Sequence, residues 1–209
     1  MFDLLREDIK AIKDRDPAAK SSLEIFLLYP GLKAIRMYRR AHKHYLKGHS
    51  FRARYISQKA ARKTGIEIHP GATIGRRLVI DHGTGIVIGE TTEIGDDVLI
   101  YQGVTLGGTG KDVGKRHPTI GNRVMISAGS KVLGPITIGD DSRVAAGAVV
   151  LKDVPPNSTV VGVPAKVVRQ NGKKVDIKPL DQIHIPDPVQ IELDALNKKI
   201  KELEAKIKE

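Results

Sequence analysis

Aliphatic residues recur every six positions through the middle of the chain. They occupy thirteen positions between Ile68 and Val150, namely 68, 74, 80, 88, 94, 100, 106, 120, 126, 132, 138, 144 and 150. Glycine often follows them, and at this density it would cost a helix roughly 1 kcal/mol per position. A six-residue period with one buried aliphatic residue instead predicts a solenoid of short parallel strands, in which each coil stacks on the next. Three positions per coil give a little over four coils.

The N-terminal segment, residues 1–63, has a different pattern. Leu5, Ile9 and Ile12 fall on one helical face, and a second helical run follows Pro30-Gly31. Asp16-Pro17 is typical of a helix start, because an acidic N-cap is followed by proline at the first helical position. This segment is therefore predicted to be helical.

The C-terminal segment predicts a further helix. Apolar residues from Val189 to Ile207 alternate in steps of four and three, which is a heptad seam. The seam predicts a coiled coil and hence an oligomer, and the alternative is a single helix packed back on the solenoid. The predicted fold is thus α+β, with helices in residues 1–63, a parallel β-helix domain in 64–168, and an extension ending in the coiled-coil helix in 169–209.

The six-residue repeat is interrupted twice, and insertions in a repeat array map to loops that commonly form the binding face. Ile80 and Ile88 are eight residues apart, and the segment between them holds the one Asp-His pair of the repeat, Asp81-His82. We expect the two extra residues to lift Asp81 and His82 out of the coil. Leu106 and Ile120 are fourteen residues apart, across LGGTGKDVGKRHPT. The glycines there permit close approach of a ligand, and basic side chains follow them. The interruptions are therefore the predicted site.

Composition excludes several classes of chemistry. The 209 residues include no cysteine, which excludes disulfides, thiol nucleophiles and cysteine-ligated metals. No apolar run reaches the length of a membrane span and the N-terminus is not a secretory signal, so we expect a soluble cytoplasmic protein without a membrane partner. The net charge is +11, with a dense basic segment at 42–63. We interpret this segment as a solvated helix face and expect no nucleic acid, since a polyphosphate cofactor also suits a basic protein.

Five motifs together resemble one enzyme family. IHPGATIG, DHGTGIVIGE, VTLGGTGK, RHP and GVPAKVV are similar to those of serine O-acetyltransferase, a hexapeptide-repeat acyltransferase, and the resemblance runs from about Asp16 through Val168. It implies a left-handed parallel β-helix, whereas the general rule for crossovers would favour the right hand. It also implies a homotrimer, with sites between subunits. The implied reaction transfers acetyl from acetyl-CoA to L-serine, giving O-acetyl-L-serine and CoA in the first step of cysteine biosynthesis from serine, with no metal required.

The resemblance also implies the catalytic residues. Serine's hydroxyl is a weak nucleophile at neutral pH, so its attack on a thioester needs a base. The resemblance makes His82 this base, in a direct transfer without an acyl-enzyme. Glu67 stands where the family has an aspartate that orients the base. Because glutamate adds a methylene, its hydrogen bond to His82 requires a different geometry, and the alternative is an exposed strand residue.

The remaining site residues follow from the same resemblance. Asp16 and Asp81 would bind the ammonium of serine, and Arg116 the carboxylate, with His117 beside it. For the cofactor, Ala128 and Ala146 are eighteen residues apart, so they should stack on adjacent coils and leave backbone amides open to the pantetheine arm. Gly108 would lie beside the thioester. The alternative is that these small residues only fit tight corners.

Other functions remain open from the sequence. A related acetyltransferase acting on a sugar or an antibiotic would not need Asp16, Asp81 and Arg116. A γ-class carbonic anhydrase needs three histidines for zinc, but His69, His82 and His117 have gaps of thirteen and thirty-five residues. A scaffold or binding protein would use both interruptions as ordinary loops. O-Acetylserine sulfhydrylase is a candidate partner, although the chain ends in KIKE without the C-terminal isoleucine through which some relatives dock.

Overall fold

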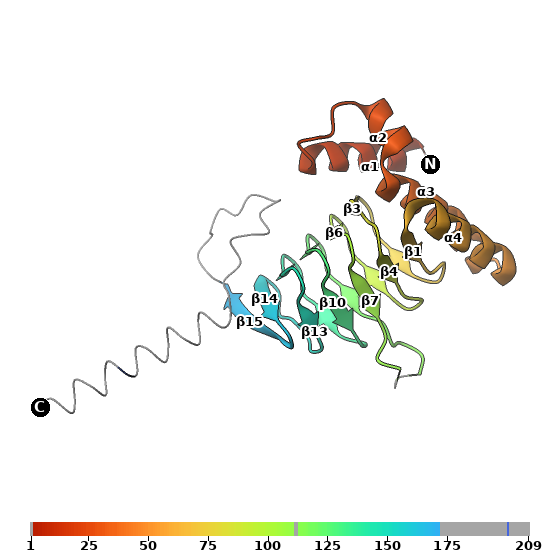
Figure 1. The fold of residues 1–209 in the computed structure, drawn as a ribbon. Coiled ribbons are helices and arrows are strands. Elements are labelled where there is room, and N and C mark those ends of the chain that lie inside the picture. The colour runs from red at the N-terminus through yellow and green to blue at the C-terminus, as the bar shows by residue number, and fades with distance from the viewer. Residues whose placement is uncertain (1, 111–112, 172–199, 201–209) are drawn as a thin grey trace, which may run out of the picture.

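Four helices precede a parallel β-solenoid in the computed structural model, which describes residues 2–110, 113–171 and 200 (Figure 1). The helices are α1 (Phe2–Arg15), α2 (Ser22–Leu28), α3 (Pro30–Leu46) and α4 (Ser50–Thr64). No helix within these residues is long and apolar enough to cross a membrane. The predicted C-terminal coiled coil lies outside the described residues.

The solenoid consists of three sheets, and the first four coils each give one strand to every sheet. Sheet A has the order β1-β4-β7-β10-β13, sheet B β11-β8-β5-β2, and sheet C β15-β14-β12-β9-β6-β3. All pairs are parallel except β14 with β15, which folds back at the C-terminal end of sheet C. The strands are β1 (Ile66–Ile68), β2 (Thr73–Ile74), β3 (Val79–Asp81), β4 (Ile86–Ile88), β5 (Glu93–Ile94), β6 (Leu99–Tyr101), β7 (Thr105–Gly107), β8 (Thr119–Ile120), β9 (Met125–Ile126), β10 (Lys131–Leu133), β11 (Thr137–Ile138), β12 (Arg143–Val144), β13 (Val149–Val150), β14 (Ser158–Gly162) and β15 (Ala165–Gln170).

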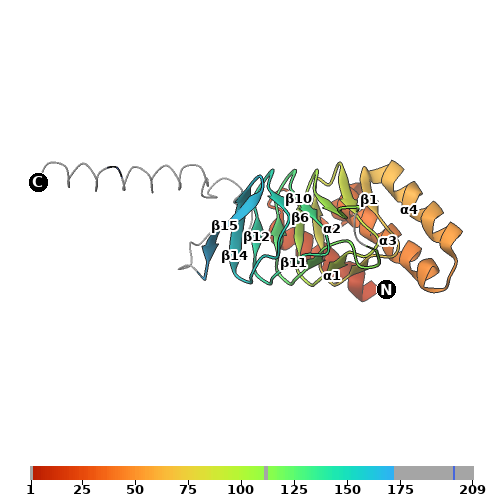
Figure 2. The same cartoon turned by 90° about the horizontal axis from the view of Figure 1, so that it is seen from below.

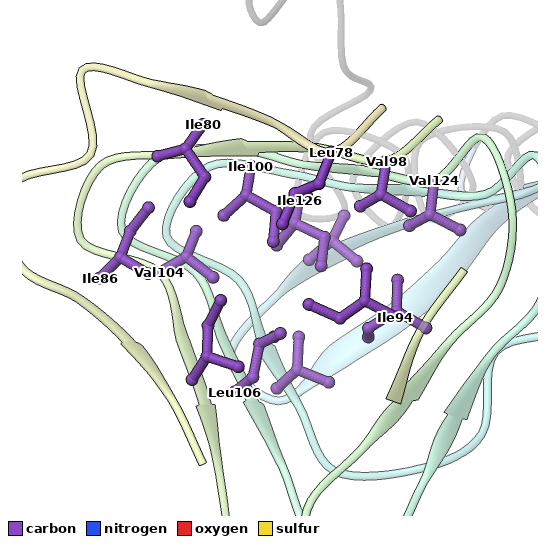
Figure 3. Close-up of a cluster of buried hydrophobic side chains, with 14 of the residues drawn as sticks. Leu78, Ile80, Ile86, Ile94, Val98, Ile100, Val104, Leu106, Val124 and Ile126 are labelled. Atoms are coloured by element: carbon purple, nitrogen blue, oxygen red, sulfur yellow. The ribbon is translucent and has the colours of Figure 1, made fainter. Parts of the chain in front are cut away.

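The aliphatic repeat forms the core of the solenoid, as the sequence predicts. Ile88 pairs with Ile68 on one side and with Leu106 on the other, so repeat positions stack in register. Figure 3 shows Leu106 and other core side chains, among them Ile94, Ile100 and Ile126, pointing into the space enclosed by the sheets. The inward position is buried in every coil, which selects a six-residue period, whereas outward positions such as Val79 and Leu99 are buried only where the N-terminal helices pack on sheet C.

The number of coils exceeds the predicted number. The sequence pattern predicts that the rhythm ends at Val150, but Val154 bridges to Ile138 and Val160 pairs with Val144, which completes a fifth coil. The last coil is shorter, since Val160 follows its partner by sixteen residues in place of the usual eighteen. The periodicity therefore fails there because the corner is contracted, and the solenoid continues.

The predicted helix start at Asp16-Pro17 is wrong. Asp16 follows the end of α1, and its backbone N–H donates to the Ile12 carbonyl. Its carboxylate accepts from the N–H of Ala18 at 2.7 Å, which makes a turn. The next helix is α2, whose N-cap is Ser21 with its hydroxyl accepting from the N–H of Glu24. An aspartate followed by proline suits both a cap and a turn, and here the end of α1 selects the turn.

Helices α3 and α4 cover the N-terminal end of the solenoid (Figures 1 and 2). Three of their side chains approach carbonyls of the first coil: Tyr38 donates to Ala72, Ser57 donates to Ile68 at 2.7 Å, and Nδ1 of His42 lies 2.8 Å from the Pro70 carbonyl. An exposed end of a solenoid would offer unpaired backbone groups to other chains. The helical pair covers that end and partners these carbonyls.

Ser57→Ala tests this covering role. The hydroxyl and the Ile68 carbonyl are both buried, so the variant leaves a buried acceptor without its donor. We expect the free energy of unfolding to fall by about 1–2 kcal/mol. Urea unfolding at one fixed protein concentration measures it, and exposed Ser50 on the same helix supplies the control, Ser50→Ala. Equal stability of the two variants would contradict the role of Ser57.

Candidate active site

The first interruption consists of two extra residues, His82 and Gly83. Asp81 stays in β3 and pairs in register with Tyr101, so the sequence-based hypothesis that Asp81 leaves the coil is wrong. The corner then resumes at Thr84, whose carbonyl accepts from the N–H of Gly103 in the next coil. At the corners between sheets C and A, His82 and Gly83 are thus the two residues without an equivalent in the next coil.

The backbone of these two residues explains their types. His82 has φ 57° and Gly83 has φ 88°, both in the left-handed region. A side chain on Gly83 would place Cβ 2.5 Å from Cδ1 of Ile66, a core residue, so glycine is required by both conformation and space. His82 is exposed, and its strained backbone turns its side chain away from the core. The insertion thus presents an imidazole at the edge of the solenoid.

Asp16 and Asp81 line one small cavity together, while their role toward an ammonium stays a prediction. Asp16 comes from the turn after α1, and Asp81 from the end of β3; Arg15 and Tyr29 complete the polar lining. Burial raises the pKa of Asp81; the nearby Asp16 carboxylate acts in the same direction, while His82 opposes it. The Arg15 guanidinium in the same lining is paired with Asp97, so the carboxylates of Asp16 and Asp81 are left to meet a cation beside His82.

Asp81→Asn should separate binding from stability. A carboxyl whose folded-state pKa is raised destabilises the fold above that pKa, and this cost disappears below the unfolded-state value of about 3.9. The variant should therefore raise Tm at neutral pH, but not below about pH 3. Its KM for an amine-bearing acceptor should rise about tenfold, because the cation loses a charged partner. Calorimetry at the two pH values and steady-state kinetics measure both effects, and an unchanged KM would remove Asp81 from the site.

Tyr29 also lines the cavity, and the sequence does not predict this position. Its hydroxyl donates to Oδ2 of Asp16 at 2.6 Å. Burial, followed by this hydrogen bond, raises its pKa well above the usual range, so the phenol stays protonated. Tyr29 lies between α2 and α3, where no repeat indicates its role. The Pro30-Gly31 pair after it marks only a helix boundary.

A second group of predicted residues surrounds Arg116. Its guanidinium donates to Oε2 of Glu90 at 2.5 Å, and Glu90 also accepts from the hydroxyl of Tyr45 at 3.1 Å. The bond from Arg116 lowers the pKa of Glu90. His117 is buried, with Nδ1 2.9 Å from the Thr91 hydroxyl, and burial followed by the Arg116 charge lowers its pKa. Arg116 and His117 are thus held in place by Glu90, Tyr45 and Thr91. The sequence analysis did not identify these three residues.

The two groups lie on different edges of the solenoid. His82 lies on the edge where sheet C turns into sheet A, which we call the C–A edge and which comprises residues 82–85, 102–104, 127–130 and 145–148. Arg116 and His117 lie where sheet A turns into sheet B, the A–B edge, whose described residues are 69–72, 89–92, 108–110, 113–118 and 134–136. Strands of sheet A separate these edges, so one chain does not bring His82 and Arg116 together.

Glu67 lies in the middle of β1, between buried Ile66 and Ile68. Within the described chain, no hydrogen bond joins its carboxylate to His82. Its charge acts on His69, whose pKa is lowered mainly by burial and raised in part by Glu90 and Glu67. The orienting role of Glu67 stays a prediction. In the described ranges, no three histidine, aspartate or glutamate side chains gather into a possible metal site.

Ala128 and Ala146 stack on adjacent coils of the C–A edge. The N–H of Gly147 donates to the Ala128 carbonyl at 2.9 Å, and in the coil before it the N–H of Gly129 donates to Gln102. Across residues 2–110 and 113–171, the N–H groups of the two alanines donate to no backbone carbonyl. They therefore lie on the same edge as His82, with free donors. Gly108 lies on the A–B edge, where a Cβ would come within 3.1 Å of the Arg116 carbonyl.

The fold and the edge groups define a transferase built from hexapeptide repeats, and comparisons with known proteins agree. Residues 117–152 match the bacterial transferase hexapeptide family, and residues 1–37 match the N-terminal family of serine acetyltransferases. A serine acetyltransferase of Bacillus subtilis (strain 168) is 55% identical over 208 residues, which cover 100% of this chain and 95% of that protein. The chain belongs to the serine acetyltransferase family and is an acyltransferase.

Solved structures of the family share the fold. The serine acetyltransferase of Brucella abortus strain S19 in complex with coenzyme A has a TM-score of 0.80 at 46% identity, over 83% of this chain and 69% of that chain. The Neisseria gonorrhoeae enzyme in complex with serine has a TM-score of 0.77 at 44% identity, over 80% and 69%. The predicted solenoid is therefore the left-handed β-helix that the resemblance implies.

Proposed function

We propose that this protein transfers the acetyl group of acetyl-CoA to the hydroxyl of L-serine, which gives O-acetyl-L-serine and CoA and begins cysteine biosynthesis from serine. One observation carries this proposal: the two-residue insertion places His82 at the start of an edge whose next coils offer free backbone amides. The Brucella abortus and Neisseria gonorrhoeae relatives, solved with coenzyme A and with serine, support the two substrates.

Acetyl-CoA would lie along the C–A edge. Neighbouring coils are about 4.8 Å apart, so Thr84, Gln102, Ala128 and Ala146 mark a track about 14 Å long. The free N–H groups of Ala128 and Ala146 would donate to the amide carbonyls of the pantetheine arm. This direction brings the thioester to the His82 end of the track, where the acceptor hydroxyl must also lie.

His82 would act as a general base. As the serine oxygen attacks the thioester carbonyl, the imidazole removes the hydroxyl proton. When the tetrahedral intermediate collapses, the C–S bond breaks and the imidazolium returns the proton to the sulfur of CoA. The transfer is direct, and His82 ends in its starting state. Glu67 is proposed to orient the imidazole.

The amino acid would be bound at both ends by charges on different edges. Asp16 and Asp81 would bind its ammonium on the C–A edge, close to His82. Arg116 would bind its carboxylate, with His117 beside it, on the A–B edge. Since one chain keeps these edges apart, the complete site requires two copies. A homotrimer, in which the A–B edge of one copy meets the C–A edge of the next, would form three such sites.

Turnover of acetyl-CoA with L-serine tests the function directly. In an assay of thiol release, we expect CoA formation that depends on serine, with no comparable rate for glucose or another neutral sugar. A neutral sugar carries neither an ammonium for Asp16 and Asp81 nor a carboxylate for Arg116. Activity with a sugar, and none with serine, would replace the proposed function by a related acetyltransferase.

Arg116→Ala should mainly weaken serine binding. A charge-assisted, bidentate contact to the carboxylate is lost, so we expect the serine KM to rise about tenfold to a hundredfold with a smaller change in kcat. Exposed Arg123 pairs with Asp141, away from both edges, and Arg123→Ala is the matched control. Steady-state kinetics at saturating acetyl-CoA measure the effect, and an unchanged serine KM would exclude Arg116 from the site.

A further inference from the structure

Asp16 is held by two hydrogen bonds although it lies outside the solenoid. It belongs to the turn between α1 and α2, where a short side chain would otherwise rotate about two bonds. The N–H of Ala18 donates to Oδ1 at 2.7 Å, and the hydroxyl of Tyr29 donates to Oδ2 at 2.6 Å. Each carboxylate oxygen thus has one donor, which fixes the plane of the group.

The position of Tyr29 is fixed in turn. It ends α2, where its N–H donates to the Ile25 carbonyl, and it begins α3, where its carbonyl accepts from the N–H of Lys33. Gly31, two residues later, lies so close to β3 that a Cβ would be 2.3 Å from the Ile80 carbonyl. Tyr29 therefore belongs to a segment that packs directly on the strand carrying Asp81.

The two donors leave Asp16 with a defined binding capacity. Each oxygen of a carboxylate can accept about two hydrogen bonds, so each keeps one free site. Tyr29, Asp16 and Asp81 line the same cavity. A ligand there meets two carboxylates, one oriented by Tyr29 and one by the end of β3.

We propose that Tyr29 is a positioning residue for the acceptor's ammonium, holding Asp16 in the orientation in which Asp16 and Asp81 bind that cation together. The inference rests on the proposed function, because it needs an acceptor with an amine. Tyr29 acts through Asp16, so its removal should change recognition of the amine end alone.

Tyr29→Phe tests this role by removing one hydroxyl. We expect the serine KM to rise about threefold to tenfold, the loss expected for one hydrogen bond to a charged group, with kcat changed less than twofold and the acetyl-CoA KM unchanged. Inhibition by ethanolamine, which keeps the amine, should weaken by the same factor. Inhibition by 3-hydroxypropanoate, which lacks it, should stay as in the unmodified protein.

Tyr38→Phe is the matched control. Tyr38 lies on α3 and donates its hydroxyl to the Ala72 carbonyl, away from the cavity. The control should lower Tm at least as much as Tyr29→Phe while leaving the ratio of the two inhibition constants unchanged. If both variants shift that ratio equally, or neither does, Tyr29 has only a structural role and the inference is overturned.

A double-mutant cycle with Asp16→Asn shows whether Tyr29 acts through Asp16. In the Asp16→Asn background, Tyr29→Phe should raise the serine KM by less than twofold, because the group that Tyr29 orients has lost its charge. Independent, multiplicative effects would overturn the inference.

The inference and the proposed function can fail separately. Absence of serine acetylation by the unmodified protein would overturn both, whereas normal activity of that protein with an unchanged serine KM in Tyr29→Phe would overturn the inference alone.

Discussion

His82→Ala should lower kcat for serine acetylation by at least two orders of magnitude while coenzyme A binds nearly as before. A positioned general base contributes about 10²–10⁴ to the rate, and no other imidazole lies on the C–A edge of the described chain. The cofactor track depends on the backbone of Ala128 and Ala146, two and three coils from the insertion, so it should be intact. Steady-state kinetics measure kcat, and titration calorimetry measures the Kd for CoA.

Two controls sharpen this result. His49→Ala removes an exposed histidine before α4 and should leave kcat unchanged. His82→Asn keeps a polar side chain at the same left-handed backbone position, which asparagine tolerates, so it removes the base with little added strain. Near-normal turnover of His82→Asn would show that His82 shapes the corner and does not move the proton.

The repeat region was predictable because one physical cause produces its pattern. An inward aliphatic residue must recur wherever a coil turns toward the core, so the shared register of Ile68, Ile88 and Leu106 follows from their spacing once two inserted residues are allowed. The eight-residue step at Ile80 likewise located the insertion. The spacing did not show which two residues leave the coil, because Asp81 and His82 fit it equally well. The pairing of Asp81 with Tyr101 shows that Asp81 stays in its strand.

The contacts that assemble the site were not predictable in this way. Tyr29 and Asp16 come from the helical segment. The periodicity of the sequence does not show which turn of a helix packs against which coil. The separation of His82 and Arg116 was not predicted either. The repeat identifies the inward positions, but it does not show at which edge of the solenoid each loop lies. Handedness came from the family resemblance alone. Long-range packing between unlike elements is thus what the sequence pattern does not record.

The helices and the solenoid contribute different parts of the proposed site. The solenoid supplies His82, Asp81 and the alanine track at fixed spacing. The helices supply Asp16 with Tyr29, and through Tyr45 they also contact Glu90 and so Arg116. Because α3 begins next to Tyr29 and holds Tyr45 near its end, one helix contacts the ammonium-binding residues of one proposed site and the carboxylate-binding residues of another. Acceptor recognition would therefore depend on helix docking more than the cofactor track does.

Mixed oligomers of two variants that are each impaired at low serine concentration should recover activity if the site forms between copies. His82→Ala keeps the Arg116 half, and Arg116→Ala keeps the His82 half. In a cyclic trimer that contains both kinds of subunit, one junction of three joins the two intact halves. We therefore expect about one third of the unmodified activity in co-expressed, doubly tagged and tandem-purified protein, assayed at serine concentrations far below the raised KM of Arg116→Ala.

The control for this experiment pairs two variants from the same edge. His82→Ala and Asp16→Asn each alter a site residue on the C–A edge, so no mixed trimer contains a subunit whose C–A edge is intact. Their mixtures should be no more active than the single variants. Recovery only in the first mixture would require that Arg116 of one copy serve His82 of another. Failure of both mixtures, with mixed trimers demonstrated by the two tags, would mean that His82 and Arg116 of the same chain serve one site, and the shared site would be excluded.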